Sequence, residues 1–244
     1  MKVVAVASGK GGVGKSTVSL GLARALAARG FAVGLLDADV YGPDIPLMLG
    51  LKQTRDLRRW ELGRNPRFGR ASLEPVEVLG LKVMSVGFLL AERQAFEMPA
   101  PLVALAARQL VHDVRWGELD FLVVDLPPGT ADLQQQMFAS EEIAGAIVVV
   151  GPQDAAHLDA RKLVAVLRDA GVPVLGAVEN MRGLHCPHCG EPIEVFPPVA
   201  PDRSLLAELE LLVSIPLDPG YARLNGIAPP FAELAGRVVE KLAG

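Results

Sequence analysis

Short runs of apolar, β-branched residues alternate along the chain with longer stretches in which apolar residues recur at helical spacing. Such short continuous runs are typical of strands in a parallel sheet that is buried on both faces. The alternation predicts an α/β fold, with a doubly wound, mostly parallel sheet and helices on both faces. Strands are expected at 3–7, 33–36, 83–86, 121–124, 147–150, 174–178 and 212–215, and helices at 15–29, 102–114, 157–170 and 231–243.

The domain organisation follows from two stretches that break this pattern. Residues 52–75 are rich in arginine and only weakly periodic, so we expect an insertion there. Residues 182–201 contain five prolines and both cysteines of the chain, which indicates an excursion on the surface. Neither stretch marks a domain boundary. We therefore expect one domain over 1–244, with the insertion near 52–75 and a cysteine-bearing loop near 182–201.

Composition and charge narrow the class of protein. The formal net charge of −4 argues against a protein that coats nucleic acid, although positive charge gathers locally between Lys52 and Arg70. No apolar run approaches the ~18–20 residues of a membrane-spanning helix. The apolar run after Lys2 is also too short for a signal peptide. We therefore expect a cytoplasmic protein without a membrane partner.

A phosphate-binding motif lies between the first predicted strand and the first predicted helix. Glycine lets the backbone turn so that its N–H groups meet phosphate oxygens, and the start of the helix adds its positive dipole end. Lys15 is expected to reach the β- and γ-phosphates and the Ser16 hydroxyl to bind Mg²⁺. A glycine-rich turn without a ligand is the alternative. The motif G-x-x-x-x-G-K-[ST] comprises Gly9, Lys10, Gly11, Gly12, Val13, Gly14, Lys15, Ser16 and Thr17.

Acidic residues follow two of the predicted strands. Asp37 and Asp39 come after the second strand, and Asp125 ends a run of four apolar residues, as in a Walker B strand. The carboxyl ends of parallel strands face the crevice where such sheets bind ligands. One acid can therefore hold a Mg²⁺-bound water while another orients the attacking water. Gly129 is expected to present its N–H to the γ-phosphate, and helix-capping aspartates are the alternative for Asp39.

Cys186 and Cys189 form a C-P-H-C-G segment that resembles a metal-binding turn. Zinc and iron–sulfur sites both take four ligands, typically thiolates, and one chain supplies two. A two-fold axis between two chains would complete a set of four cysteines. We expect His185 and His188 to point outward. A redox pair and a pair without function remain as alternatives.

Several separated motifs resemble the Mrp/ApbC family of P-loop ATPases, within the MinD/ParA superfamily that has a deviant Walker A loop. The resemblance implies an ATP-dependent carrier that holds a [4Fe–4S] cluster between two subunits of a homodimer and passes it to apo iron–sulfur proteins. The motifs are G-K-G-G-V-G-K-S-T, D-A-D-V-Y-G-P, V-M-S-V-G-F, D-L-P-P-G-T, P-Q-D, E-N-M and C-P-H-C-G.

The resemblance also implies roles for individual residues. Lys10 would act on the nucleotide of the partner subunit, and Asp39 would orient the attacking water. The Asn180 amide would contact the purine edge, and the segment with Pro216 and Asp218 would cover the adenine. Two features depart from the family: Ala131 stands where many relatives have glycine, and 196–201 replaces a glycine-rich run. We also expect the separate N-terminal domain of many relatives to be absent, and the coupling of nucleotide to cluster to differ.

Two other functions fit part of the sequence. A ParA/MinD-like positioning ATPase would use the same loop to bind DNA or membrane, and six arginines between Arg55 and Arg70 offer phosphate contacts. A solvated loop is the favoured explanation of these arginines, and we do not expect nucleic acid as a partner. A scaffold that binds ATP without turnover is the third possibility. The cysteine segment favours the carrier, with zinc as the competing metal.

Overall fold

The computed structural model describes residues 1–244 except 41, 52–72, 89–109, 130–141, 224–225 and 244. Most of the expected helix 102–114, most of the arginine-rich segment and Ala131 lie outside the described residues. Within the described ranges, every helix is too short or too polar to reach across a bilayer.

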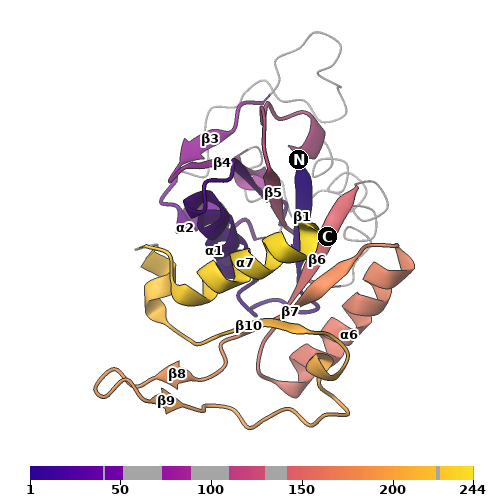
Figure 1. The fold of residues 1–244 in the computed structure, drawn as a ribbon, viewed down its shortest axis with the longest axis vertical. Coiled ribbons are helices and arrows are strands. Elements are labelled where there is room, and N and C mark those ends of the chain that lie inside the picture. Colours follow the sequence, from indigo (N-terminus) through magenta and orange to yellow (C-terminus); the bar gives the residue numbers. More distant parts are fainter. Residues whose placement is uncertain (41, 52–72, 89–109, 130–141, 224–225, 244) are drawn as a thin grey trace.

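An eight-stranded sheet organises the chain, in the order β10-β7-β6-β1-β5-β2-β4-β3 (Figure 1). All pairs are parallel except β3 with β4, which confirms the predicted mostly parallel sheet. The strands are β1 (Lys2–Ala7), β2 (Val33–Asp37), β3 (Val76–Val78), β4 (Leu81–Ser85), β5 (Phe121–Asp125), β6 (Ile143–Val150), β7 (Val174–Asn180) and β10 (Leu211–Ile215).

Helices lie on both faces of this sheet. The connection from β1 to β2 contains α1 (Lys15–Ala28), and the connection from β6 to β7 contains α6 (Asp154–Asp169). These connections step in opposite directions along the sheet, so right-handed crossovers place α1 and α6 on opposite faces. The last helix, α7 (Pro229–Ala243), packs against α1 (Figure 1). The predicted doubly wound architecture is confirmed.

Short helices complete the described chain. The four-residue α2 (Ile45–Met48) follows β2. Three 3₁₀ turns are η2 (Val86–Phe88) after β4, η3 (Leu205–Ala207) before β10 and η4 (Pro219–Arg223) before α7.

Two strands of the eight-stranded sheet differ most from the sequence prediction. β6 begins at residue 143, four residues before the expected start, because Ala144 and Gly145 continue the strand despite their weak strand propensity. β3 was not predicted. It has the short sequence Val-Glu-Val and only half-buried valines, so it lacks the apolar run that marks the central strands.

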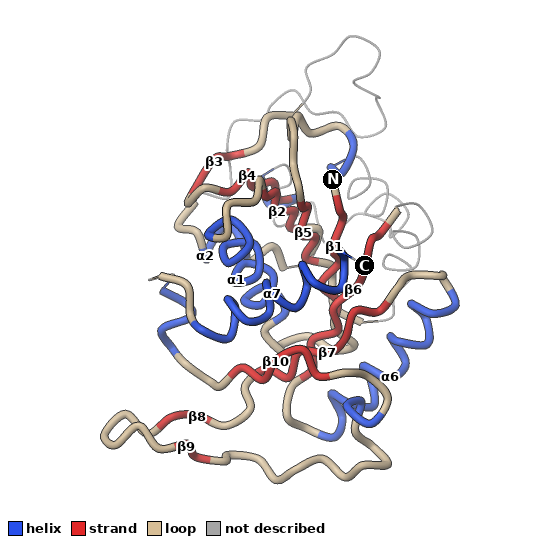
Figure 2. The backbone as a smooth tube through the Cα atoms, viewed as in Figure 1, coloured by secondary structure: helices blue, strands red, loops and turns tan. Residues whose placement is uncertain are grey.

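The predicted surface excursion at 182–201 contains a hairpin of β8 (Leu184–His185) and β9 (Pro192–Ile193), which projects beside β10 (Figure 2). Its base is held to the sheet edge, because Arg182 N donates to Ile215 O over 3.1 Å and Leu217 N donates to Gly183 O over 2.8 Å. After β9 the chain returns to α6. There the Leu205 N–H donates to Nδ1 of the fully buried His157 over 3.1 Å.

The contact between α1 and α7 yields a test of the packing. A Cβ atom on Gly21 would lie 2.4 Å from the buried Phe231 ring, whereas one on Gly236 of α7 would find Arg29 at 3.5 Å. We expect Gly21→Ala to lower the free energy of unfolding by about 1–3 kcal/mol through overpacking. The control Gly236→Ala should raise it by up to ~1 kcal/mol, since alanine favours the helix. Denaturant unfolding of both variants measures this, and equal stabilities would contradict the packing.

Candidate functional site

The glycine-rich loop joins the end of β1 to the start of α1. Gly12 and Gly14 have φ angles of 79° and 80°, a left-handed conformation that suits glycine. A Cβ atom on Gly14 would also lie 2.2 Å from Asn180 Nδ2, so no larger residue fits there without displacing that amide. Gly14 caps α1 without a side chain, which leaves the first N–H groups of the helix to an outside acceptor. This arrangement suits an anion such as a phosphate.

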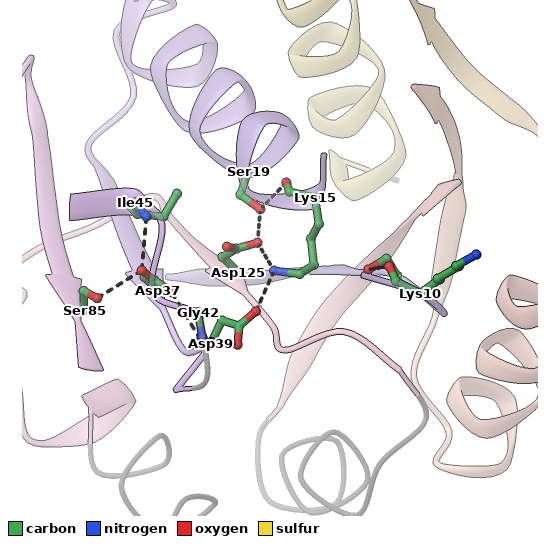
Figure 3. A network of polar contacts seen from close by, with 10 residues as sticks. Lys10, Lys15, Ser19, Asp37, Asp39, Gly42, Ile45, Ser85 and Asp125 are labelled. Atoms are coloured by element: carbon green, nitrogen blue, oxygen red, sulfur yellow. Dashed lines mark hydrogen bonds and ion pairs between the residues drawn. The ribbon is translucent and has the colours of Figure 1, made fainter. Parts of the chain in front are cut away.

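The Lys15 side chain turns into the protein, where it is 6% exposed. Its Nζ donates to Asp125 Oδ1 over 2.8 Å and lies 3.8 Å from Asp39 Oδ2 (Figure 3). Ser19 Oγ lies 2.7 Å from the same Asp125 oxygen. Ser19 was not predicted from the sequence, although its position one helical turn after Lys15 places both on one face of α1. The structure thus brings Lys15 together with two of the three predicted acids, Asp39 and Asp125.

Asp125 gives the clearest indication that the site fits a cation. It is fully buried, and its Oδ2 atom has no hydrogen-bond partner among the described residues. A buried carboxylate oxygen without a donor is costly, so a cation or its bound water fits this position. Ser16, in the first turn of α1, is partly exposed and offers a hydroxyl oxygen. These are the oxygen ligands and water contacts that Mg²⁺ prefers.

Asp37 and Asp39 face different partners. Asp37 is fully buried, and its oxygens accept hydrogen bonds from Asp39 N (3.2 Å), Ile45 N (3.3 Å) and Ser85 Oγ (3.0 Å). Burial raises the pKa of Asp37 well above its usual range, and the charge of Asp125 raises it further. Asp39 lies nearer the surface, with Oδ1 accepting from Gly42 N over 3.3 Å and Oδ2 toward Lys15. The contact of Asp37 with the bound cofactor stays a prediction.

Lys10 and Gly129 flank the loop. The Lys10 side chain is exposed and points away from Lys15 (Figure 3), so it does not join the cluster of its own chain. The Gly129 N–H donates to Ser8 O over 2.9 Å. Contact of Gly129 with a γ-phosphate would require this bond to be exchanged, and it also stays a prediction.

The residues expected at the adenine come from the end of β7 and from the chain after β10. Asn180 is the last residue of β7 rather than a loop residue, and its Nδ2 donates to Val13 O over 2.8 Å. Asp218 Oδ1 accepts from Gly220 N over 2.7 Å, and Pro216 is half-buried. A cavity between α1 and the start of α7 is lined by other residues, among them Thr17, Gly21, Arg24, Tyr221 and Phe231. The expected base contacts stay predictions.

The cysteine pair lies in the turn at the tip of the β8–β9 hairpin. Cys186 N donates to Glu191 O and Gly190 N donates to Cys186 O, both over 2.8 Å, which closes the turn. Hydrogen bonds from the backbone N–H groups of Cys189 and His188 lower the pKa of the Cys186 thiol. They favour the thiolate, which is the form that binds metals. Both cysteines are free, and Cys189 is exposed.

One chain does not complete a metal site. Within the part of the chain that the structure describes, no three His, Cys, Asp or Glu side chains gather where they could hold a metal ion. His185 and His188 are exposed, as expected for histidines that face solvent. The hairpin therefore offers two thiol ligands, half of the set that zinc or an iron–sulfur cluster takes.

Comparison with known proteins assigns the chain to a family. A family model described as "NUBPL iron-transfer P-loop NTPase" matches residues 1–238. Curated relatives include the iron-sulfur cluster carrier protein of Aquifex aeolicus, 42% identical over 93% of this chain, and that of Pyrococcus horikoshii, 38% identical over 98%. The chain spans 61% of the length of the Aquifex relative and 86% of the Pyrococcus relative.

Solved structures agree with this assignment. A nucleotide-binding protein of Archaeoglobus fulgidus in complex with ADP superimposes with a TM-score of 0.75, at 36% identity over 94% of this chain and 90% of its own. The septum site-determining protein MinD of Pyrococcus horikoshii, in complex with Mg-ADP, has a TM-score of 0.68 at 23% identity, covering 100% of this chain and 97% of its own. The MinD likeness concerns the fold alone. The resemblance found in the sequence is confirmed, and the chain belongs to the family of iron-transfer P-loop NTPases.

Proposed function

We propose that this chain binds and hydrolyses ATP, assembles a [4Fe–4S] cluster between two copies of itself, and transfers the cluster to apo iron–sulfur proteins. The observation that carries the proposal is the Cys186–Cys189 turn, where backbone N–H groups favour a thiolate on an exposed hairpin. It belongs to a chain that also has the Lys15–Asp125 pair of a P-loop NTPase. The Aquifex and Pyrococcus relatives bear the name of such a carrier.

In this proposal, contacts with the nucleotide replace contacts that Lys15 makes within its own chain. Lys15 Nζ moves from Asp125 to the β- and γ-phosphate oxygens, while the N–H groups at the start of α1 hold the phosphates. Ser16 would bind Mg²⁺ and Asp125 would act on its water shell, and the bound ion would neutralise charge on the phosphates.

Hydrolysis then depends on groups at the edge of the site. Asp39 orients a water that attacks the γ-phosphorus, and the bond to the bridging oxygen breaks to give ADP and phosphate. Lys10 of one copy stabilises the charge that develops on the nucleotide of the other copy, because in its own chain it points outward. This gives a role to an exposed lysine that does not join the cluster around Lys15.

The cluster is cargo rather than a structural part of the domain. Two thiolates per chain become four when two hairpins meet across a two-fold axis. The hairpin projects from the sheet, so a cluster at its tip stays accessible to an acceptor (Figure 2). The arginine-rich segment that would favour a positioning ATPase lies mostly outside the described residues, and no described feature favours that function.

The first prediction separates nucleotide binding from hydrolysis. Lys15→Ala should weaken Mg–ATP binding by about 10- to 150-fold, the value of a charge-assisted hydrogen bond of ~1.5–3 kcal/mol. Asp39→Ala should keep binding within about threefold of wild type and lower turnover at least tenfold, the loss of a group that positions the attacking water. Calorimetric titration and phosphate release measure the two effects.

Matched controls are an exposed lysine of α6 and an exposed aspartate of the chain between β2 and α2. Lys162→Ala and Asp44→Ala remove exposed charges and should leave both measurements unchanged. Circular dichroism must show Lys15→Ala to be folded, because the change leaves the buried Asp125 without its cation. If folded Lys15→Ala binds Mg–ATP as tightly as wild type, the assignment of the nucleotide site is contradicted. If the wild type binds ATP without turnover, the function as a scaffold is favoured over hydrolysis.

The second prediction concerns Lys10. Lys10→Ala should bind ATP normally and lose turnover, because the lysine acts on the partner's nucleotide. Mixing it with Asp39→Ala chains should restore part of the activity, since one site of each mixed dimer then has both an intact Asp39 and a partner's Lys10. Mixed dimers are verified by mass spectrometry. Their lack of activity would refute the action across the interface.

The third prediction concerns the cysteines. After anaerobic reconstitution, the wild type should hold about one four-iron cluster per dimer, or roughly two irons per chain. Cys186→Ser and Cys189→Ser should lose the iron and keep ATP binding, whereas His188→Ala should keep both. Iron analysis, absorption spectra and transfer to an apo-ferredoxin measure this. Tightly bound zinc without iron transfer would contradict the carrier function.

A further inference from the structure

The segment V-M-S-V-G-F at 83–88 enters the site described so far only through the hydrogen bond from Ser85 to Asp37. It forms the end of β4 and the η2 turn, with Ser85 at the point where they meet. Ser85 pairs in register with Asp37 of the neighbouring strand β2, and both residues are fully buried. A buried serine in a run of apolar residues calls for a partner, because an unsatisfied hydroxyl is costly in the interior.

The Ser85 hydroxyl connects two loops. It donates to Asp37 Oδ2 over 3.0 Å (Figure 3). It also accepts from Gly87 N over 2.9 Å, so its orientation is fixed from both sides. Asp37 in turn accepts from Asp39 N over 3.2 Å and from Ile45 N over 3.3 Å. The carboxylate therefore holds both ends of the chain between β2 and α2.

Close packing supports the same connection. A Cβ atom on Gly87 would lie 2.9 Å from the Cβ and Cγ atoms of Pro43, which belongs to the chain between β2 and α2. No left-handed φ angle accounts for this glycine, so contact alone requires the small residue. The η2 turn and the loop that carries Asp39 thus fit together without space for a methyl group.

We propose that Ser85 is a positioning residue, which sets the Asp39 carboxylate for hydrolysis by holding Asp37 and with it the backbone of the Asp39 loop. This inference rests on the proposed ATP hydrolysis. The Asp39 oxygens lie near Lys15 Nζ and Gly42 N at 3.8 and 3.3 Å, distances that the position of the Asp39 backbone determines. A displacement of about 1 Å in a positioned group is enough to slow a reaction strongly.

A kinetic cycle tests the inference. Ser85→Ala should lower kcat about tenfold, the effect of one lost hydrogen bond, and keep the Kd for Mg–ATP within about threefold. In the Asp39→Ala background, the same change should lower kcat by less than about twofold, because the group that Ser85 positions is already gone. Ser204→Ala, which removes the hydroxyl that caps η3, is the matched control and should leave kcat unchanged. If the losses in kcat from Ser85→Ala and Asp39→Ala multiply in the double variant, the two residues act independently and the inference is overturned.

Hydrogen exchange in the nucleotide-free protein gives a readout that needs no activity. The amides of Asp39 and Ile45 should exchange at least tenfold faster in Ser85→Ala than in wild type. Both amides donate to Asp37, and the variant removes the hydrogen bond from Ser85 that holds Asp37. Gly87→Ala, which pushes Pro43 away, should do the same, whereas Gly236→Ala should not. Melting temperatures verify that each variant is folded.

The outcomes distinguish this inference from the function on which it rests. If the wild type binds but does not hydrolyse ATP, the proposed hydrolysis fails, while exchange at Asp39 and Ile45 still decides whether Ser85 holds the loop. If the wild type hydrolyses ATP and Ser85→Ala matches it in kcat, the positioning role is refuted. Faster exchange together with a lower kcat and an unchanged Kd supports it.

Discussion

A buried ammonium group among buried carboxylates is the interaction on which the nucleotide end of this molecule depends. Lys15 Nζ lies 2.8 Å from Asp125, whose other oxygen has no partner in the described chain, and the neighbouring Asp37 is also fully buried. Burial raises the pKa of Asp37 well above its usual range, and the charge of the nearby Asp125 raises it further. Binding of a cation at this site therefore lowers its electrostatic energy. Ligand binding and stability are coupled at this edge of the sheet.

The parts of the fold that the sequence predicts are those with strong local patterns. β1, the glycine-rich loop and α1 follow from an apolar run, a motif and a helical period that all agree. β3 has no such signal, because a short edge strand with a charged centre resembles a loop. The early start of β6 depends on its pairing with β1 and β7, which adjacent residues in the sequence do not reveal.

The same distinction applies to the site. Lys15, Asp39 and Asp125 are predictable, because their motifs fix which strand or loop carries them and parallel strands bring their ends together. Ser85 is not, since its contact with Asp37 joins residues 48 positions apart and depends on which strand lies next to β2. Likewise, the contact of the Asn180 amide with Val13 O needs the three-dimensional approach of β7 to the loop.

The cysteine hairpin is held by fewer buried contacts than the sheet. Its strands have two residues each, its apolar Ile193 and Val195 are about half exposed, and its attachments lie at its two ends, beside β10 and at His157 of α6. Segments with few buried contacts open with a small fraction of the global free energy of unfolding. The hairpin can therefore melt and reform many times while the sheet stays folded. In the proposed function, release of a cluster from its sulfur atoms would then be a local event that leaves the nucleotide site intact.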